Sequence, residues 1–180
     1  MIHPLVADCS RLHATAETAA IAARLLHRAS ETLRNDLPED WPEWSALVPH
    51  LQELLTLPGP PTGKRQLQMI AEAAAAACYA LTWSGSYGRS MELAASVLSH
   101  ADILGNSRSA LCLRFQRIMA LSYQGATAEA EQQYRHLITQ QISLLGRYHP
   151  DVMASLREIS WVILKQGRYA EAEEVALYEG

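Results

Sequence analysis

The chain has 180 residues, of which 49% are hydrophobic and 19% are charged. This composition is that of a folded globular protein and excludes a disordered chain. A formal net charge of −4 argues against a surface built to bind nucleic acid, although it is compatible with local basic patches. The amino terminus lacks a signal-peptide pattern, and the longest apolar run, Ala73 to Leu81, is too short to span a bilayer. We therefore expect a cytoplasmic protein that has no membrane segment and no nucleic-acid partner.

The first third of the chain predicts helices interrupted by proline. A helical stretch runs from about Leu5 to Leu33, with a break near Thr15 to Thr18. Asp40 or Trp41 can cap the next helix, because Pro42 suits a first helical turn. The stretch "LPGPPTGKR" then predicts a linker, since proline and glycine together prevent a continuous helix.

Strand signals are nearly absent, so we expect an all-α protein. The chain divides into an N-terminal helical region (1–57), a linker (58–65) and about three helical hairpins (66–180). Six helices are predicted in the last part: Gln66–Ser84, Gly88–Leu104, Ser107–Gln124, Ala128–Leu145, Pro150–Gln166 and Ala170–Tyr178.

These six helices form pairs with a regular period. Gly85, Gly125 and Gly167 each end a helix, and the glycine recurs after 40 and then 42 residues. Glycine closes a helix in the left-handed conformation at low cost. A second hinge, "ILGNSRS" in one pair and "LLGRYHPDV" in the next, repeats in register. Two hinges with one period predict a tandem array of helical hairpins.

The stretch "SLLGRYHPDVMASLREISWVILKQGRYAEAEEV", from Ser143 to Val175, resembles tetratricopeptide (TPR) repeats in their longer, kinesin-light-chain-like form. The resemblance implies a right-handed superhelical α-solenoid. The earlier units depart from the family pattern: Gly88 stands where alanine is common, Thr127 replaces a tyrosine, and Arg117 replaces a core leucine.

A second resemblance covers the first third of the chain. "IHPLVADCSRLH" followed by "DWPEWSALVPHLQELL" is similar to the join between a winged-helix module and a repeat array in actinobacterial NB-ARC/STAND ATPases. In that family the array senses or recruits a partner. The resemblance implies that this chain is a sensor portion, with the ATPase module of the same system as a partner.

Residues that could carry chemistry do not form a catalytic or metal-binding pattern. "GPPTGKR" superficially resembles a phosphate-binding loop, but Arg65 stands where Ser or Thr would bind magnesium. No histidine lies at metal-ligand spacing, and Cys9, Cys78 and Cys112 form no CxxC pair. We expect three small buried thiols in a reducing compartment, no catalytic residue, no cofactor and no metal.

One face of the first helix of each pair carries the most informative pattern. Positions nine, six and two residues before each hinge glycine share a helical face. In TPR arrays this stripe faces the concave groove, so the resemblance implies that it contacts a ligand, although packing between repeats is the alternative. The candidate groove residues are Tyr79, Trp83, Gln116, Met119, Tyr123, Glu158, Trp161 and Lys165, together with Ala76.

The leading hypothesis is a non-enzymatic module that binds a partner's peptide or helix in this groove. The first alternative is a sensor or autoregulatory fragment of a STAND-type ATPase. The second is a self-associating scaffold, since an array without a polar cap would form homodimers through its apolar end.

Overall fold

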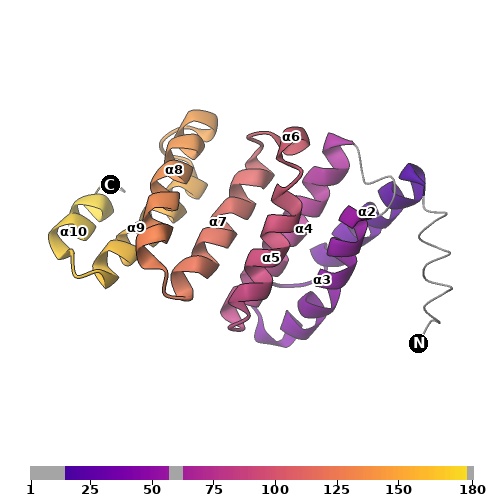
Figure 1. The fold of residues 1–180 in the computed structure, drawn as a ribbon, viewed down its shortest axis with the longest axis horizontal. Coiled ribbons are helices and arrows are strands. Elements are labelled where there is room, and N and C mark those ends of the chain that lie inside the picture. Colours follow the sequence, from indigo (N-terminus) through magenta and orange to yellow (C-terminus); the bar gives the residue numbers. More distant parts are fainter. Residues whose placement is uncertain (1–14, 57–62, 178–180) are drawn as a thin grey trace.

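The computed structural model describes residues 15–56 and 63–177, and these residues form helices without any strand (Figure 1). A 3-10 turn, Pro38–Asp40, precedes the second helix. The predicted all-α class is therefore confirmed. The α-helices are α2 (Ala16–Glu31), α3 (Trp41–Thr56), α4 (Lys64–Trp83), α5 (Tyr87–Leu98), α6 (Ala101–Leu104), α7 (Arg108–Tyr123), α8 (Thr127–Leu145), α9 (Pro150–Lys165) and α10 (Tyr169–Leu177).

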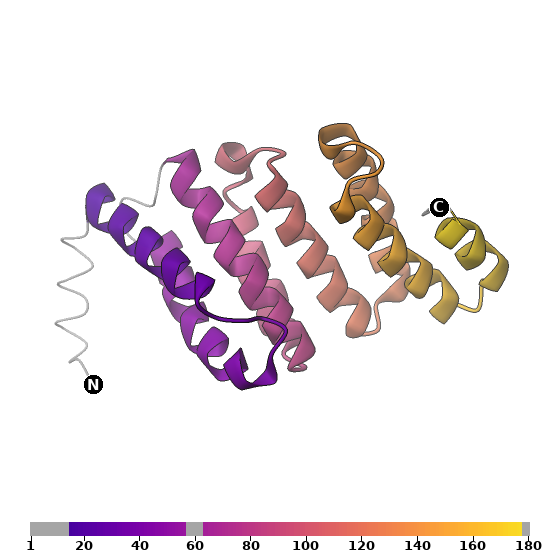
Figure 2. The same ribbon diagram turned by 180° about the vertical axis from the view of Figure 1, so that it is seen from behind.

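The helices follow one another along the long axis of the molecule as antiparallel pairs (Figures 1 and 2). The predicted pairs are α4–α5, α7–α8 and α9–α10, and each first helix packs on its neighbours on both sides. α2 and α3 form a further pair that packs on α4, so the N-terminal region joins the row of helices directly. The domain boundaries proposed from the sequence stay a prediction, and most of the predicted linker lies outside the described residues.

Where the structure describes them, helix boundaries agree with the sequence to within two residues, except that one predicted helix is divided. α2 begins at a capping box, in which Thr15 and Thr18 each bond the other's backbone N–H, while the predicted start at Leu5 lies outside the described residues. α4 begins at Lys64, two residues before its predicted start. The predicted helix Gly88–Leu104 is wrong as one unit, because it breaks after Leu98. There the Ser99 hydroxyl donates to the Ser96 carbonyl at 2.7 Å, which competes with helix continuation.

The alanine-rich run of α4 allows close helix packing. Ala71, Ala74 and Ala77 are fully buried between the helices that surround α4, because their small side chains let backbones approach. Larger side chains fill the core on either side, among them Trp44 of α3 and Leu67. Within residues 15–56 and 63–177, no helix combines the length and apolar character needed to cross a membrane.

Two hydrophobic cores meet at α7. Leu113 belongs to the first core, which runs from α2 through α4 and α5. Leu111 and Ile118 belong to the second, which includes Tyr134 of α8 and Ile163 of α9. α7 thus contributes side chains to both cores.

The hinge glycines have the backbone predicted for them. Gly85, Gly125 and Gly167 have φ angles of +81°, +103° and +80°, in the region that favours glycine. At the other hinge, His149 accepts a hydrogen bond from the Asp151 backbone N–H and caps α9, while Pro150 occupies the first turn.

Ion pairs connect the α7–α8 hairpin to the α9–α10 hairpin at two places. Arg108 donates to both carboxylate oxygens of Asp151, at 2.8 and 3.1 Å, and holds the pKa of that carboxyl below its usual value despite partial burial. Glu131 accepts from Arg135 and Arg168 at 2.7 and 2.6 Å. Burial opposes ionisation of Glu131, but these bonds lower its pKa overall. Both clusters cross from one hairpin to the next.

Candidate functional site

The predicted stripe lies on the first helices of three consecutive pairs, α4, α7 and α9. α4 packs on α7, and α7 contacts α9, so equivalent positions on these helices become neighbours. Residues spaced by three, four and seven share a face of a helix. The equivalent faces of α4, α7 and α9 therefore adjoin and form one continuous surface across the array.

Aromatic rings from neighbouring hairpins touch along this surface. The Trp83 ring lies 5.9 Å from that of Tyr79 and 5.5 Å from that of Tyr123, measured between centroids. Tyr87, the first residue of α5, stacks on Tyr123 at 6.3 Å. Such tilted and stacked pairs are favourable arrangements of aromatic quadrupoles. Tyr87 was not among the predicted stripe residues, although its position two residues after the hinge glycine was a usable signal.

A lysine continues the row of rings toward the third hairpin. The Lys165 ammonium lies 5.2 Å from the ring centroid of Tyr123 and 5.4 Å from that of Trp161. Cation–π contacts at this distance are attractive. We call Tyr79, Trp83, Tyr87, Tyr123, Trp161 and Lys165 the aromatic stripe. Trp83 and Trp161 are each 47% exposed, so the stripe presents a large apolar surface to solvent.

The other predicted stripe residues lie deeper. Met119 is only 3% exposed and belongs to the interior, so it offers a ligand little surface. Glu158 is largely covered, and burial raises the pKa of its carboxyl above the usual value despite nearby Arg157 and Lys165. Ala76 is partly buried and packs against the first core. The role of the predicted residues in ligand binding stays a prediction.

Gln116 opens onto a small cavity between α7, α8 and α9. The cavity has a volume of about 170 Å³ and is also lined by Cys112, Gln141 and Asp151. The Oε1 atoms of Gln116 and Gln141 are buried and have no hydrogen-bond partner among the described residues, and Gln141 is only 1% exposed. Unpaired buried acceptors are costly in a folded protein, so these two amide oxygens favour a hydrogen-bond donor inside the cavity.

The described thiols lack the properties of nucleophiles. Burial raises the pKa of Cys78 to about 12. Burial, followed by the Asp151 carboxylate, raises that of Cys112 to about 11. Both thiols are therefore protonated at neutral pH. Cys78 has the buried setting predicted for it, Cys112 is only partly covered, and Cys9 lies outside the described residues. In the described part of the chain, no three potential metal ligands form a group.

Comparison with known structures identifies the fold. The chain is similar to crystal structures of nearly identical TPR-like repeats from a Podosopora anserina protein likened to kinesin light chains. One matches with a TM-score of 0.50 at 18% identity and covers 99% of this chain and 95% of that one. A second crystal structure of such repeats matches with a TM-score of 0.49 at 18% identity and covers 88% and 82%. A scan against models of protein families and a search of curated proteins both give no match.

The chain is therefore an α-solenoid of TPR-like helical hairpins. Stacked hairpins of this class leave an extended concave surface.

Proposed function

We propose that the chain holds a peptide or helix of a partner protein across the aromatic stripe, without catalysing a reaction. The single observation that carries this proposal is the contact between rings of successive hairpins, from Tyr79 through Trp83 and Tyr123 to Lys165 and Trp161. Solvent-exposed tryptophans in a row are unusual on a surface that binds nothing.

The exposed area is large enough to matter for affinity. Covering the exposed half of one tryptophan removes on the order of 100 Å² of mostly apolar surface, which corresponds to about 2–3 kcal/mol. Trp83 and Trp161 are both in this state. Lys165 and Glu158 would select the charge of the bound segment.

The test is affinity capture with the full chain followed by mass spectrometry. We expect Trp161→Ala combined with Tyr123→Ala to abolish partner capture while circular dichroism shows unchanged helicity. The matched control is Tyr148→Ala, which removes a ring that is 84% exposed outside the stripe. Capture that survives the double substitution, or that falls equally in the control, would contradict the groove proposal.

We infer a regulatory role as the finer form of this function, with the ATPase module of a STAND-type system as the candidate partner. The sequence resemblance of the first third supports it, and α3, which carries part of that resemblance, packs directly on the array. A gene for a nucleotide-binding core immediately upstream is expected, and its product should bind the chain. Failure of that product to bind would reject this candidate.

Self-association is the remaining candidate function, and light scattering over a range of concentrations tests it. A strictly monomeric protein would reject it.

Free Cys78 and Cys112 are consistent with a reducing, cytoplasmic setting.

A further inference from the structure

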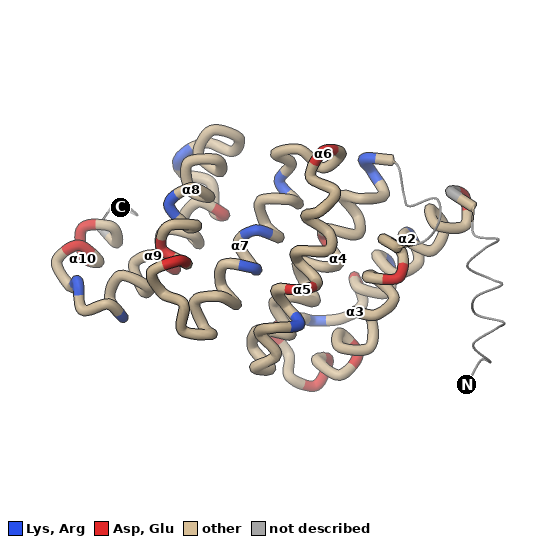
Figure 3. Tube along the Cα trace, in the orientation of Figure 1, with Lys and Arg blue, Asp and Glu red and all other residues tan. Residues whose placement is uncertain are grey.

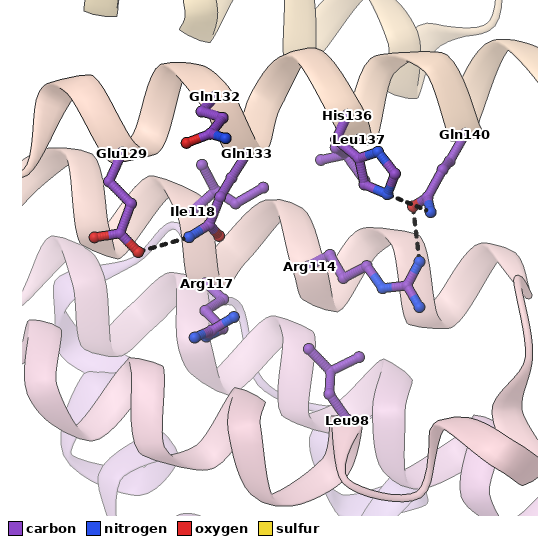
Figure 4. Close-up of a pocket in the computed structure, with 10 residues that line it drawn as sticks. All are labelled: Leu98, Arg114, Arg117, Ile118, Glu129, Gln132, Gln133, His136, Leu137 and Gln140. Carbon is purple, nitrogen blue, oxygen red and sulfur yellow. Dashed lines mark hydrogen bonds between the residues drawn. The ribbon is translucent and has the colours of Figure 1, made fainter.

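A second groove lies on the other side of α7 from the aromatic stripe (Figure 4). It has a volume of about 560 Å³, with α7 as its floor, α8 as one wall and the end of α5 as the other. Arg114 and Arg117 project into it from α7. On the helical wheel they lie far from Gln116, Met119 and Tyr123, so the two surfaces are separate.

The groove exists because two second helices are kept apart. α5 and α8 each pack extensively on α7, whereas no comparable packing joins α5 to α8 within the described residues. α5 ends at Leu98, where the Ser99–Ser96 hydrogen bond breaks the helix, whereas α8 continues to Leu145. The floor between them is thus open to solvent, and Leu98, Ile118 and Leu137 provide its apolar part.

The charge of this groove is not neutralised within the fold. α7 carries three arginines, Arg108, Arg114 and Arg117, and no acidic residue (Figure 3). Arg108 pairs with Asp151. Among the described residues, Arg114 donates only to the neutral acceptors Asn106 Oδ1 at 3.2 Å and Gln140 Oε1 at 2.7 Å.

Arg117 has no hydrogen bond or ion pair with any residue in the described part of the chain. Among the described residues that line the groove, Glu129 is the one carboxylate, and it accepts from Gln133 at 2.9 Å (Figure 4). The groove therefore carries two arginines that form no ion pair with it or its surroundings in the described residues, although the net charge of the protein is −4.

We propose that this groove binds an acidic segment of a partner protein. Arg114 and Arg117 are three residues apart on one helix, so their side chains start from neighbouring positions on its surface. Guanidinium groups hold carboxylates in bidentate pairs, and two such groups on one ridge match two carboxylates on one turn of a bound helix. An apolar side chain of the same segment covers Leu98, Ile118 and Leu137. This proposal does not depend on a ligand at the aromatic stripe.

The test uses defined peptides and the full chain. The probes are short fluorescein-labelled peptides that carry two Glu residues one helical turn apart and one Leu, and matched peptides with Gln in place of Glu. Fluorescence anisotropy should show binding of the Glu peptide, with at least about tenfold weaker binding of the Gln peptide. Binding should weaken between about 50 and about 200 mM NaCl, because the contacts are ionic and partly exposed.

Variants assign the binding to the groove. Arg117→Gln and Arg114→Gln should each weaken the Glu peptide about tenfold, while Arg117→Lys keeps part of the affinity because it preserves the charge. Arg28→Gln, at an exposed position of α2, makes the same charge change elsewhere and should leave the affinity unchanged. Thermal unfolding of Arg117→Gln checks the fold, which this side chain does not support through any recorded bond.

Four outcomes would overturn the proposal. The Glu peptide could fail to bind at any accessible concentration, or Arg28→Gln could weaken it as much as Arg117→Gln, which would indicate diffuse attraction. Trp161→Ala could remove binding, which would place the peptide on the aromatic stripe. A single-stranded oligonucleotide could bind more tightly than the peptide, which would make the groove a phosphate site.

Discussion

The buried amide of Gln141 provides a quantitative test of the small cavity beside the stripe. Gln141 is 1% exposed, and its Oε1 atom has no hydrogen-bond partner in the part of the chain that the structure describes. We predict that Gln141→Leu stabilises the protein. The substitution removes the unpaired carbonyl, keeps a side chain of similar length and leaves helix propensity nearly unchanged.

The size of the effect follows from two contributions. An unsatisfied buried polar group costs about 1–3 kcal/mol. Ordering a glutamine side chain costs roughly 1 kcal/mol more entropy than ordering a leucine. Polar groups that line the cavity can be solvated in part, so we expect the free energy of unfolding to rise by about 1–2 kcal/mol. In a chain of this size that corresponds to an increase in Tm of about 3–6 °C.

Urea unfolding followed by circular dichroism measures this change directly. Gln132→Leu, at an exposed position of the same helix, is the matched control and should shift the free energy by less than about 0.5 kcal/mol. A destabilised Gln141→Leu would refute the reasoning, because it would mean that the amide has a partner in solution.

Three further predictions concern the framework of the array. Glu131→Gln should cost about 1–2 kcal/mol at neutral pH, because the Glu131 carboxylate accepts from Arg135 and Arg168. The lowered pKa of Glu131 means that this stabilisation is present above the ordinary pKa of a glutamate and is lost as the pH falls through the lowered value. The free energies of unfolding of the two proteins should therefore converge in acid. Gly125→Ala should destabilise by about 1–2 kcal/mol because φ is +103°, whereas Gly88→Ala, at an exposed helical position, should stabilise by about 0.5–1 kcal/mol. Ala77→Leu should cost about 1–3 kcal/mol in thermal unfolding, since the fully buried site in α4 has no room for three more carbon atoms.

The hinges and the array could be predicted from the sequence because each depends on local chemistry. A glycine that ends a helix and an apolar period of three and four residues are visible without any tertiary information. Gly125 therefore has the left-handed backbone that the pattern indicates. The meeting of Trp83 with Tyr123 could also be expected, once equivalent positions in tandem units were aligned.

The arginine-lined groove and the burial of Met119 depend on how the helices pack against one another in the tertiary structure. The groove above Arg117 arises from the break after Leu98 and the separation of α5 from α8, and neither is encoded in a periodic pattern. The burial of Met119 likewise reflects how closely neighbouring hairpins approach. Sequence periodicity places a side chain on a helical face, but the depth of that face is decided by tertiary packing.

The position of α7 between two cores has a consequence for cooperativity. In a linear array, stability is a sum of unit terms and nearest-neighbour terms. Leu113 of α7 packs in the first core, while Leu111 and Ile118 of the same helix pack in the second. α7 therefore contributes to the stability of both cores. Fraying that starts at α10 can travel through α9 and α8 and then stop at α7, whose other side is still packed. The molecule should therefore unfold as two cooperative blocks that have α7 in common. Amide hydrogen exchange should show one level of protection in the helices before α7 and a different level in those after it.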